Sequence, residues 1–262
     1  MSQLPMPTSD SLRRGADPAW RLRSARGVRG LAVVLPVGLG VNLAAVLLEV
    51  VCDWHTAGTA RAFVAGELDY RGAEARNFPP GLCRSAFVGQ PLSFLLVTLV
   101  LLIWVHRARC NAEALNPVFR FAFSRRFAPW APLNPVAGIW WSRSVLDELW
   151  RASRPDNGEA RLRNAVVWAW WVCTALAVLL YFVGPIATLI YSGLPQVDQT
   201  GLTPPADRLA NAVLAEAVQQ TVRLGLSAVA AVLLTVVVRR ITRWQATWPG
   251  GWSYRGAIAT TT

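Results

Sequence analysis

The sequence has no lysine and only two histidines, His55 and His106, among its 262 residues. Charged residues make up only 16% of the chain. Together with the four scattered cysteines, the histidines form no set with the spacing of a metal site. No Ser-His-Asp arrangement, GxSxG, HExxH or P-loop motif is present. We therefore expect no catalytic, metal-binding or cofactor-binding residues, and a protein that is not an enzyme.

All of the basic charge is arginine, and the net charge is +11. Arginine in place of lysine throughout is typical of a GC-rich genome, so we expect a bacterial source. A net positive charge of this size is typical of proteins that bind either nucleic acid or an anionic membrane surface. How the arginines are distributed along the chain decides between the two.

Apolar residues make up 53% of the sequence and occur in long blocks rather than in helical stripes. A membrane-spanning helix needs about 20 such residues. The blocks predict spans at 31–52, 87–105 and 164–191, and a fourth within a helix from about 206 to 243. We expect an all-α integral membrane four-helix bundle in one domain, 30–245. A disordered basic tail, 1–29, would precede it and a loose tail, 246–262, would follow it.

The connection between the second and third spans has its own pattern. The second helix is expected to continue to Leu115, where Asn116-Pro117 stops it, because a residue before proline is disfavoured in the α conformation. Residues 127–141 are apolar but too short and too rich in proline for a span. Unpaired backbone is costly in hydrocarbon, so we expect a re-entrant or interfacial segment. An amphipathic helix follows at Trp141–Trp150.

The arginines fall mainly on one side of the predicted spans. Segments 1–29, 106–163 and 239–262 hold six, ten and four of them, so 20 of the 26 share a side. Of 13 tryptophans, only Trp54 falls on the other side. By the positive-inside rule we expect a bacterial plasma-membrane protein with both termini in the cytoplasm. The charge then indicates anionic lipids of the inner leaflet rather than nucleic acid, since no base-reading module accompanies it.

The segment Trp104–Ser153 also carries a family resemblance. Its matching residues are Trp104, Arg107, Asn111, Ala114, Leu115, Trp130, Ala131, Pro135, Val136, Ala137, Trp140, Leu146, Glu148, Trp150, Arg151, Ala152 and Ser153. The segment resembles the uncharacterised bacterial integral membrane family called domain of unknown function 4328. Gly138 stands where the family usually has Asn, and Ser142 where it has Pro. The looser resemblance, over about residues 30 to 240, implies an integral membrane protein with no known activity.

Two groups of polar residues are candidate contact sites. Arg107 and Asn111 share a helix face just beyond the second span. They could bind a lipid phosphate or a partner carboxylate, or satisfy carbonyls of the broken segment 127–141, which we favour. Glu216, Gln219 and neighbouring polar residues form a stripe leading into the fourth span. The stripe could line a water-filled pathway or form a hydrogen-bonded seam between helices, and we favour the seam.

Two residue pairs lie at matching depths in the predicted topology. Glu49 and Arg223 are lone charges near the outer ends of the first and fourth spans, so they could pair or snorkel separately to the interface. Arg223 could also contact Glu216 or Gln219 on its own helix. Cys52 and Cys83 both fall on the outer side, where a disulfide would persist. Free, buried thiols are the alternative, which we favour.

The sequence names no process. We expect a non-enzymatic interaction or envelope-associated module, and the alternative is a small transporter or channel subunit acting as an oligomer. A solute pathway needs facing polar residues on several spans, and the sequence offers one stripe and Asn42. Beyond the bilayer, two further partners stay open: another protein and a second copy of the chain.

Overall fold

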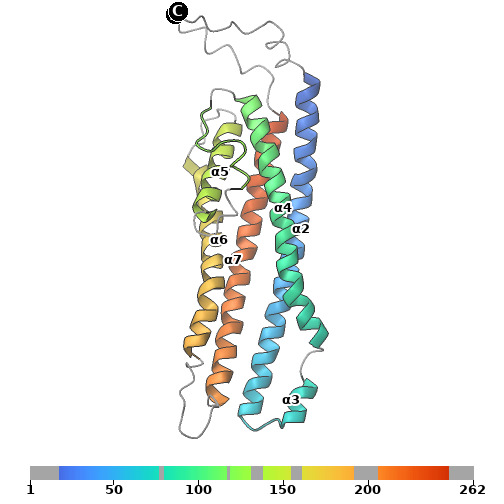
Figure 1. The fold of residues 1–262 in the computed structure, drawn as a ribbon, viewed down its shortest axis with the longest axis vertical. Helices are drawn as coiled ribbons and strands as arrows, with labels where there is room; N and C mark the ends of the chain where they lie inside the picture. The colour runs from blue at the N-terminus through green and yellow to red at the C-terminus, as the bar shows by residue number, and fades with distance from the viewer. Residues whose placement is uncertain are drawn as a thin grey trace, which may run out of the picture. The chain divides into compact units, whose positions relative to one another are not determined.

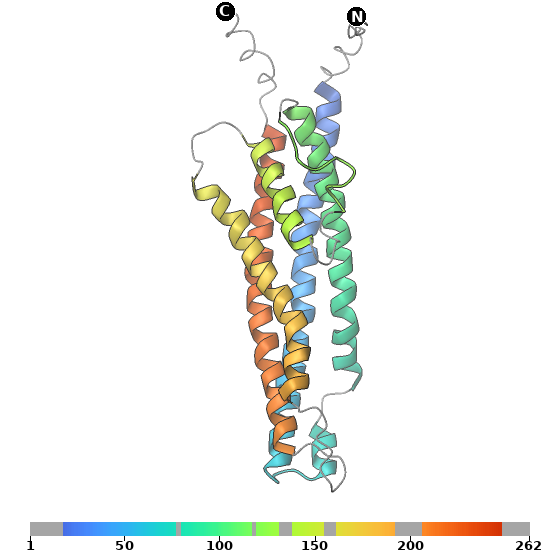
Figure 2. The same ribbon diagram turned by 60° about the vertical axis from the view of Figure 1, so that its left-hand side comes forward.

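The computed structural model describes residues 18–76, 80–116, 119–130, 138–154, 161–191 and 206–247. Within these ranges the protein is all-α, with six helices and no strand (Figure 1). The helices are α2 (Pro18–Val64), α3 (Tyr70–Arg76), α4 (Pro80–Leu115), α5 (Gly138–Ser153), α6 (Arg161–Tyr191) and α7 (Ala206–Thr247). Figure 2 shows the same elements from a second direction.

Four of these helices are long and apolar enough to cross a membrane. The qualifying stretches are Val28–Val64, Gly81–Leu115, Ala165–Val183 and Ala210–Thr247. Most of their side chains are not buried by other protein groups: in α4, for example, Leu96 is 63% exposed. Large apolar residues stay outside only where the surrounding medium is itself apolar. The protein is therefore an all-α membrane helical protein, as the blocks of apolar residues predict.

The helix bounds differ from the sequence-based ones mainly by being longer. Helix α2 begins at Pro18 and ends at Val64, so residues 18–29, which we assigned to a disordered tail, are helical. Proline suits the first position of a helix, because its missing N–H has no partner there in any case. Helix α4 ends at Leu115, as the Asn116-Pro117 sequence predicts. The short helix α3 was not predicted.

Two expected features fall at least partly outside the described residues. The prediction of a re-entrant or interfacial segment concerns 127–141, of which 131–137 are not described. The predicted loose tail lies beyond Thr247, apart from 246–247, which end α7. The amphipathic helix predicted at Trp141–Trp150 is present as α5 and is three residues longer at each end.

The described chain divides into two compact units. Unit 1 comprises Met1–Val34, Leu102–Gly158 and Val237–Thr262, and so holds the last turns of α4, all of α5 and the end of α7. Unit 2 comprises Leu35–Leu101 and Glu159–Val236. It holds most of α2, α3, the apolar part of α4, α6 and most of α7. Each unit has its own set of buried polar contacts.

Candidate functional site

The strongest cluster of buried charge lies in unit 1 and centres on Arg109 of α4. Arg109 is only 3% exposed. Its Nε donates to Glu113 at 3.0 Å, and its Nη1 donates to Glu148 of α5 at 3.4 Å. A buried cation needs such partners because it has lost its water. The two carboxylates thus compensate the guanidinium charge and join α4 to α5.

Arg109 and Glu148 also hold the segment that connects their helices. Arg109 Nη2 donates to the Phe123 carbonyl at 2.8 Å, and its guanidinium carbon lies 3.1 Å from the centroid of the Phe121 ring. Glu148 accepts the backbone N–H of Ala122 at 3.0 Å. Together the two groups of the ion pair therefore contact three consecutive residues, 121–123. We call Arg109, Glu113, Phe121, Ala122, Phe123 and Glu148 the Arg109 cluster.

A second buried cluster of unit 1 centres on Gln245, near the end of α7. Its Nε2 donates to the Ala108 carbonyl at 2.9 Å and to Ser153 Oγ at 2.8 Å. Its Oε1 accepts from Asn111 Nδ2 at 3.3 Å. A primary amide has two N–H donors and one carbonyl oxygen, so each of these three groups has a partner. Gln245 thereby ties α4, α5 and α7 together.

Tryptophans complete the interior of unit 1. Trp104 is fully buried and donates its indole N–H to Thr242 at 3.2 Å. Trp150, at 1% exposed, meets Trp244 edge to face, with ring centroids 4.7 Å apart. Aromatic pairs of this geometry contribute beyond their buried area. The interior of unit 1 thus combines buried hydrogen bonds with packed tryptophan rings.

Unit 2 contains the ion pair between the first and fourth predicted spans. Arg223 Nη2 lies 3.0 Å from Glu49 Oε2, and Arg223 is 6% exposed. The ring of Tyr181 on α6 lies 5.4 Å from the guanidinium carbon, within the range of a cation–π contact. Arg223 therefore joins α7 to α2 and contacts α6. It pairs with Glu49 rather than with Glu216 or Gln219.

Three further polar residues of unit 2 make contacts between helices. Gln219 Nε2 donates to the Leu180 carbonyl at 2.7 Å, joining α7 to α6. Asn42 Nδ2 donates to Ser93 Oγ at 2.9 Å, joining α2 to α4. Trp54 donates to Thr221 at 2.8 Å. Glu216 is exposed, so the predicted stripe is divided between a seam and the surface.

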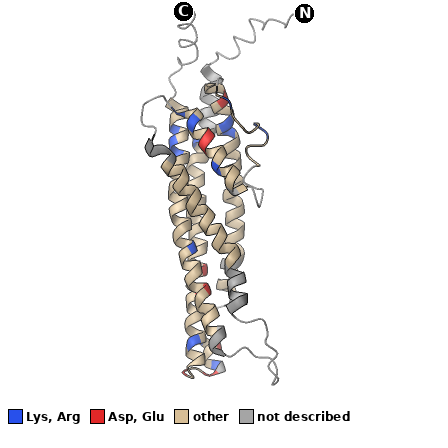
Figure 3. Ribbon diagram, turned by 90° about the vertical axis from the view of Figure 1, so that its left-hand side faces the viewer, with Lys and Arg blue, Asp and Glu red and all other residues tan. Residues whose placement is uncertain are grey.

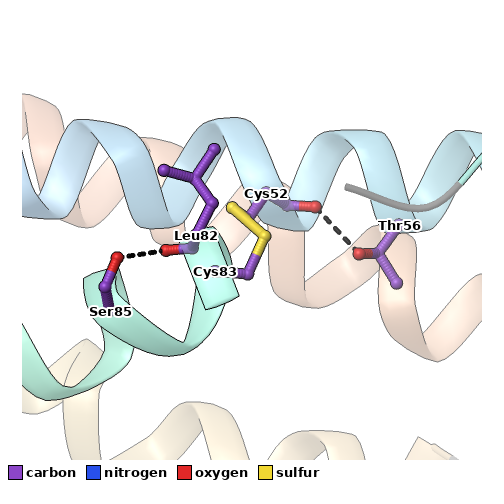
Figure 4. The surroundings of a disulfide bond; sticks show 5 residues. All are labelled: Cys52, Thr56, Leu82, Cys83 and Ser85. Carbon is purple, nitrogen blue, oxygen red and sulfur yellow. Dashed lines mark hydrogen bonds between the residues drawn. A yellow bond between two sulfur atoms is a disulfide. The ribbon is translucent and has the colours of Figure 1, made fainter. Parts of the chain in front are cut away.

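A disulfide joins α2 to α4 in the same unit. Cys52 and Cys83 are bonded, with Cα atoms 5.9 Å apart (Figure 4). This separation is near the usual value for a disulfide. Cys110 and Cys173 are free. The sequence placed these two cysteines on the same side of the membrane but did not favour a bond between them.

The contact residue predicted on α4 is a near neighbour of the arginine that is buried there. Arg107, the predicted contact residue, is exposed, whereas Arg109, two positions on, is buried. Asn111 is buried as well, but it contacts Gln245. The i,i+4 spacing of Arg109 and Glu113 was a readable signal. Nothing local indicated Gln245 or Glu148 as partners, because 134 and 39 residues separate them from the α4 residues that they contact.

A comparison with family models places these residues in a wider group. The model described as "Domain of unknown function (DUF4328)" matches residues 81–243, more than half of the chain. The chain belongs to this family. No curated protein and no solved structure matches it.

All residues of the Arg109 cluster lie within the DUF4328 match. The ion pair and the disulfide of unit 2 each have only one partner within it. Arg223 and Cys83 lie within the matched residues, whereas their partners Glu49 and Cys52 lie on α2, before residue 81. Gln245 lies two residues beyond the end of the match. The Arg109–Glu148 pair is therefore a buried charge pair whose two residues both lie within the family segment.

Proposed function

We propose that this protein is a non-enzymatic interaction module of the bacterial plasma membrane, with both termini and unit 1 in the cytoplasm. The observation that carries the proposal is the Arg109 cluster. Its charged groups bind one another and the backbone of 122–123. A fully paired network of buried charges and hydrogen bonds holds the backbone that it binds in one conformation. It does not supply a free nucleophile, base or ligand set.

The surface that the cluster supports is apolar and basic at once. Trp130 is 63% exposed, and Arg120, Arg125 and Arg126 are exposed on the same segment. Aromatic residues and arginine are the side chains most enriched where proteins meet. Holding such a segment rigid lowers the entropy cost of binding. The arrangement supports a docking role for residues 119–130.

Two observations support the orientation. The arginine distribution follows the positive-inside rule, with 20 of 26 on the side of unit 1. The Cys52–Cys83 bond belongs to unit 2, and a disulfide persists in an oxidising compartment such as the periplasm. Both signals agree on which ends of the spans face outward.

In-cell photo-crosslinking tests the interaction role directly. A photoreactive residue is placed at Arg126 or Trp130, and matched controls are placed at the exposed positions Arg71 and Arg76 of α3. The proposal predicts a discrete protein adduct from 126 and 130 that the controls do not give. The adduct partner is either another protein or a second copy of this chain. Lipid adducts alone, or none, at positions 126 and 130 would overturn the proposal.

One observation favours a transport role as the second candidate. Asp53 Oδ2 and Gln220 Oε1 are buried without a hydrogen-bond partner among the described residues. The charges of Glu49, Glu216 and Arg223 all act on the Asp53 carboxyl. Unpaired oxygens at such a place could serve a moving ion. Purified protein in liposomes should then cause an ion leak that Asp53→Asn abolishes, whereas an interaction module leaves the liposomes tight.

A further inference from the structure

Two buried oxygen atoms of unit 2 lack a hydrogen-bond donor. They are Asp53 Oδ2 on α2 and Gln220 Oε1 on α7, and neither has a partner among the described residues. A buried polar atom without a partner is uncommon, because nothing replaces the water that it has lost. Both oxygens are acceptors. A ligand that satisfies them must therefore supply a hydrogen atom or a positive charge.

The ion pair between α2 and α7 places these two oxygens at the same level. The two helices run in opposite directions, as Figures 1 and 2 show. Glu49 of α2 contacts Arg223 of α7. Asp53 lies one turn after Glu49, and Gln220 lies about one turn before Arg223, so both steps lead the same way along the pair. Asp53 is about 40° around α2 from Glu49, and Gln220 about 60° around α7 from Arg223, so both lie on the facing sides.

A second contact agrees with this register. Trp54, which follows Asp53, donates its indole N–H to Thr221 at 2.8 Å. Thr221 in turn follows Gln220 on α7. The helices therefore contact each other at neighbours of both oxygens. The carboxyl and the amide belong to one seam between α2 and α7.

The charges around Asp53 are mostly negative. Glu49, Glu216 and Arg223 act on its carboxyl. Arg223 donates to Glu49 at 3.0 Å, so its charge is already paired, and its other printed contact is with the ring of Tyr181 on α6. Figure 3 shows acidic positions next to a basic one within a long stretch of uncharged helix. A further buried negative charge at this place is costly, and a bound proton removes it.

A proton suits the two oxygens better than a metal ion. A protonated carboxyl has one O–H donor, so a protonated Asp53 donates to Gln220 Oε1 and a single proton satisfies both atoms. A metal ion would require several more ligands. Among the described residues, no group of three or more His, Cys, Asp or Glu side chains is placed to hold one. His55 is two residues from Asp53, which is about 200° around the helix.

We propose that Asp53 and Gln220 form a proton-binding site, in which the protonated Asp53 carboxyl donates to Gln220 Oε1 and fastens α2 to α7. The proton comes from water, and no other bond is made or broken. Stability that depends on a bound proton is present at low pH and is lost as the pH rises. The packing of α2 on α7 therefore responds to pH. This property depends neither on docking at residues 119–130 nor on ion transport.

Melting of the full-length protein in a neutral detergent tests the site at about pH 5 and about pH 8. Asp53→Asn places an uncharged N–H donor beside Gln220 and so imitates the protonated state. It should melt close to wild type at the lower pH and about 3 °C or more above wild type at the higher pH. The control Glu74→Gln, at an exposed position of α3, should follow wild type at both. An Asp53→Asn variant that melts at or below wild type at the higher pH would overturn the proposal.

Infrared difference spectroscopy detects the proton directly. At about pH 5 an ordinary aspartate is ionised. The spectrum of wild type minus that of Asp53→Asn should nevertheless contain the carbonyl band of a protonated carboxylic acid. The same difference taken with Glu74→Gln should contain carboxylate bands instead. Carboxylate bands alone in the Asp53→Asn difference would contradict the site.

Two further measurements keep the proposal open to refutation. If Asp53→Asn does not fold, Gln220→Leu removes the acceptor of the proton and should lower the melting temperature more at the lower pH than at the higher; equal losses would count against the site. Sodium chloride should stabilise wild type no more than choline chloride. A stabilisation by sodium that Asp53→Asn lacks would show a bound cation and make the proton assignment wrong. The crosslinking and liposome results leave all of these outcomes unaffected.

Discussion

The ion pair between Glu49 and Arg223 offers a quantitative test of how the helices of unit 2 are held together. Arg223 Nη2 and Glu49 Oε2 are 3.0 Å apart, and their side chains are 8% and 19% exposed. Removing one partner of a buried pair leaves the other charge uncompensated, which costs about 3–5 kcal/mol. For a chain of this size, 1 kcal/mol corresponds to about 2–4 °C in melting temperature. Glu49→Arg and Arg223→Glu should therefore each lower it by roughly 6–20 °C.

The double variant separates pairing from independent solvation. With both charges exchanged, the attraction is restored, so the double variant should recover at least half of the summed loss. Melting of detergent-solubilised protein, followed by tryptophan fluorescence, measures the three variants side by side. Glu74→Arg on α3 serves as a control, because Glu74 is exposed and makes no ion pair among the described residues. Additive losses in the double variant would refute the coupling, since independent residues do not compensate one another.

Two further predictions concern the other links within the units. Cys83→Ser removes a disulfide whose cysteines are 31 residues apart, which should lower the free energy of unfolding by about 3–4 kcal/mol in the chain-entropy description. Mass spectrometry of unreduced peptides identifies the bond in the wild-type protein. A variant that melts at the same temperature as wild type would show that the bond does not stabilise the protein. Arg109→Gln leaves the Glu148 carboxylate buried without its cation and should speed protease cleavage within 119–130. Glu113→Gln, which leaves the Glu148 contact intact, should have a smaller effect, and equal cleavage rates for wild type and Arg109→Gln would contradict the clamping role.

Much of the fold can be read from the sequence because the membrane imposes strong constraints. A block of apolar residues must be helical where no water can satisfy its backbone, and Asn116-Pro117 marks the end of α4 directly. The sequence also places Glu49 and Arg223, and likewise Cys52 and Cys83, at similar depths, because topology alone sets depth, but it does not decide whether either pair meets. Depth is a one-dimensional quantity, and counting along each span is enough to estimate it.

The partners within unit 1 could not be predicted in the same way. Which residue of α4 turns inward depends on the rotation of the helix about its axis, and that is set by packing against α5 and α7. A shift of two positions, from Arg107 to Arg109, rotates the side chain by about 200° around the helix. Gln245 contacts residues 92 and 137 positions away, so no local pattern reveals it.

The side of the membrane on which unit 1 lies is the central claim, and site-directed thiol labelling tests it most directly. Asn157→Cys in unit 1 and Tyr70→Cys in unit 2 are introduced separately into a variant in which Cys110 and Cys173 are alanine. The disulfide between Cys52 and Cys83 is kept, since a bonded pair does not react. With an impermeant maleimide, intact cells should label Tyr70→Cys at once and Asn157→Cys only after lysis. Labelling of Asn157→Cys in intact cells would place ten of the arginines outside and contradict the account.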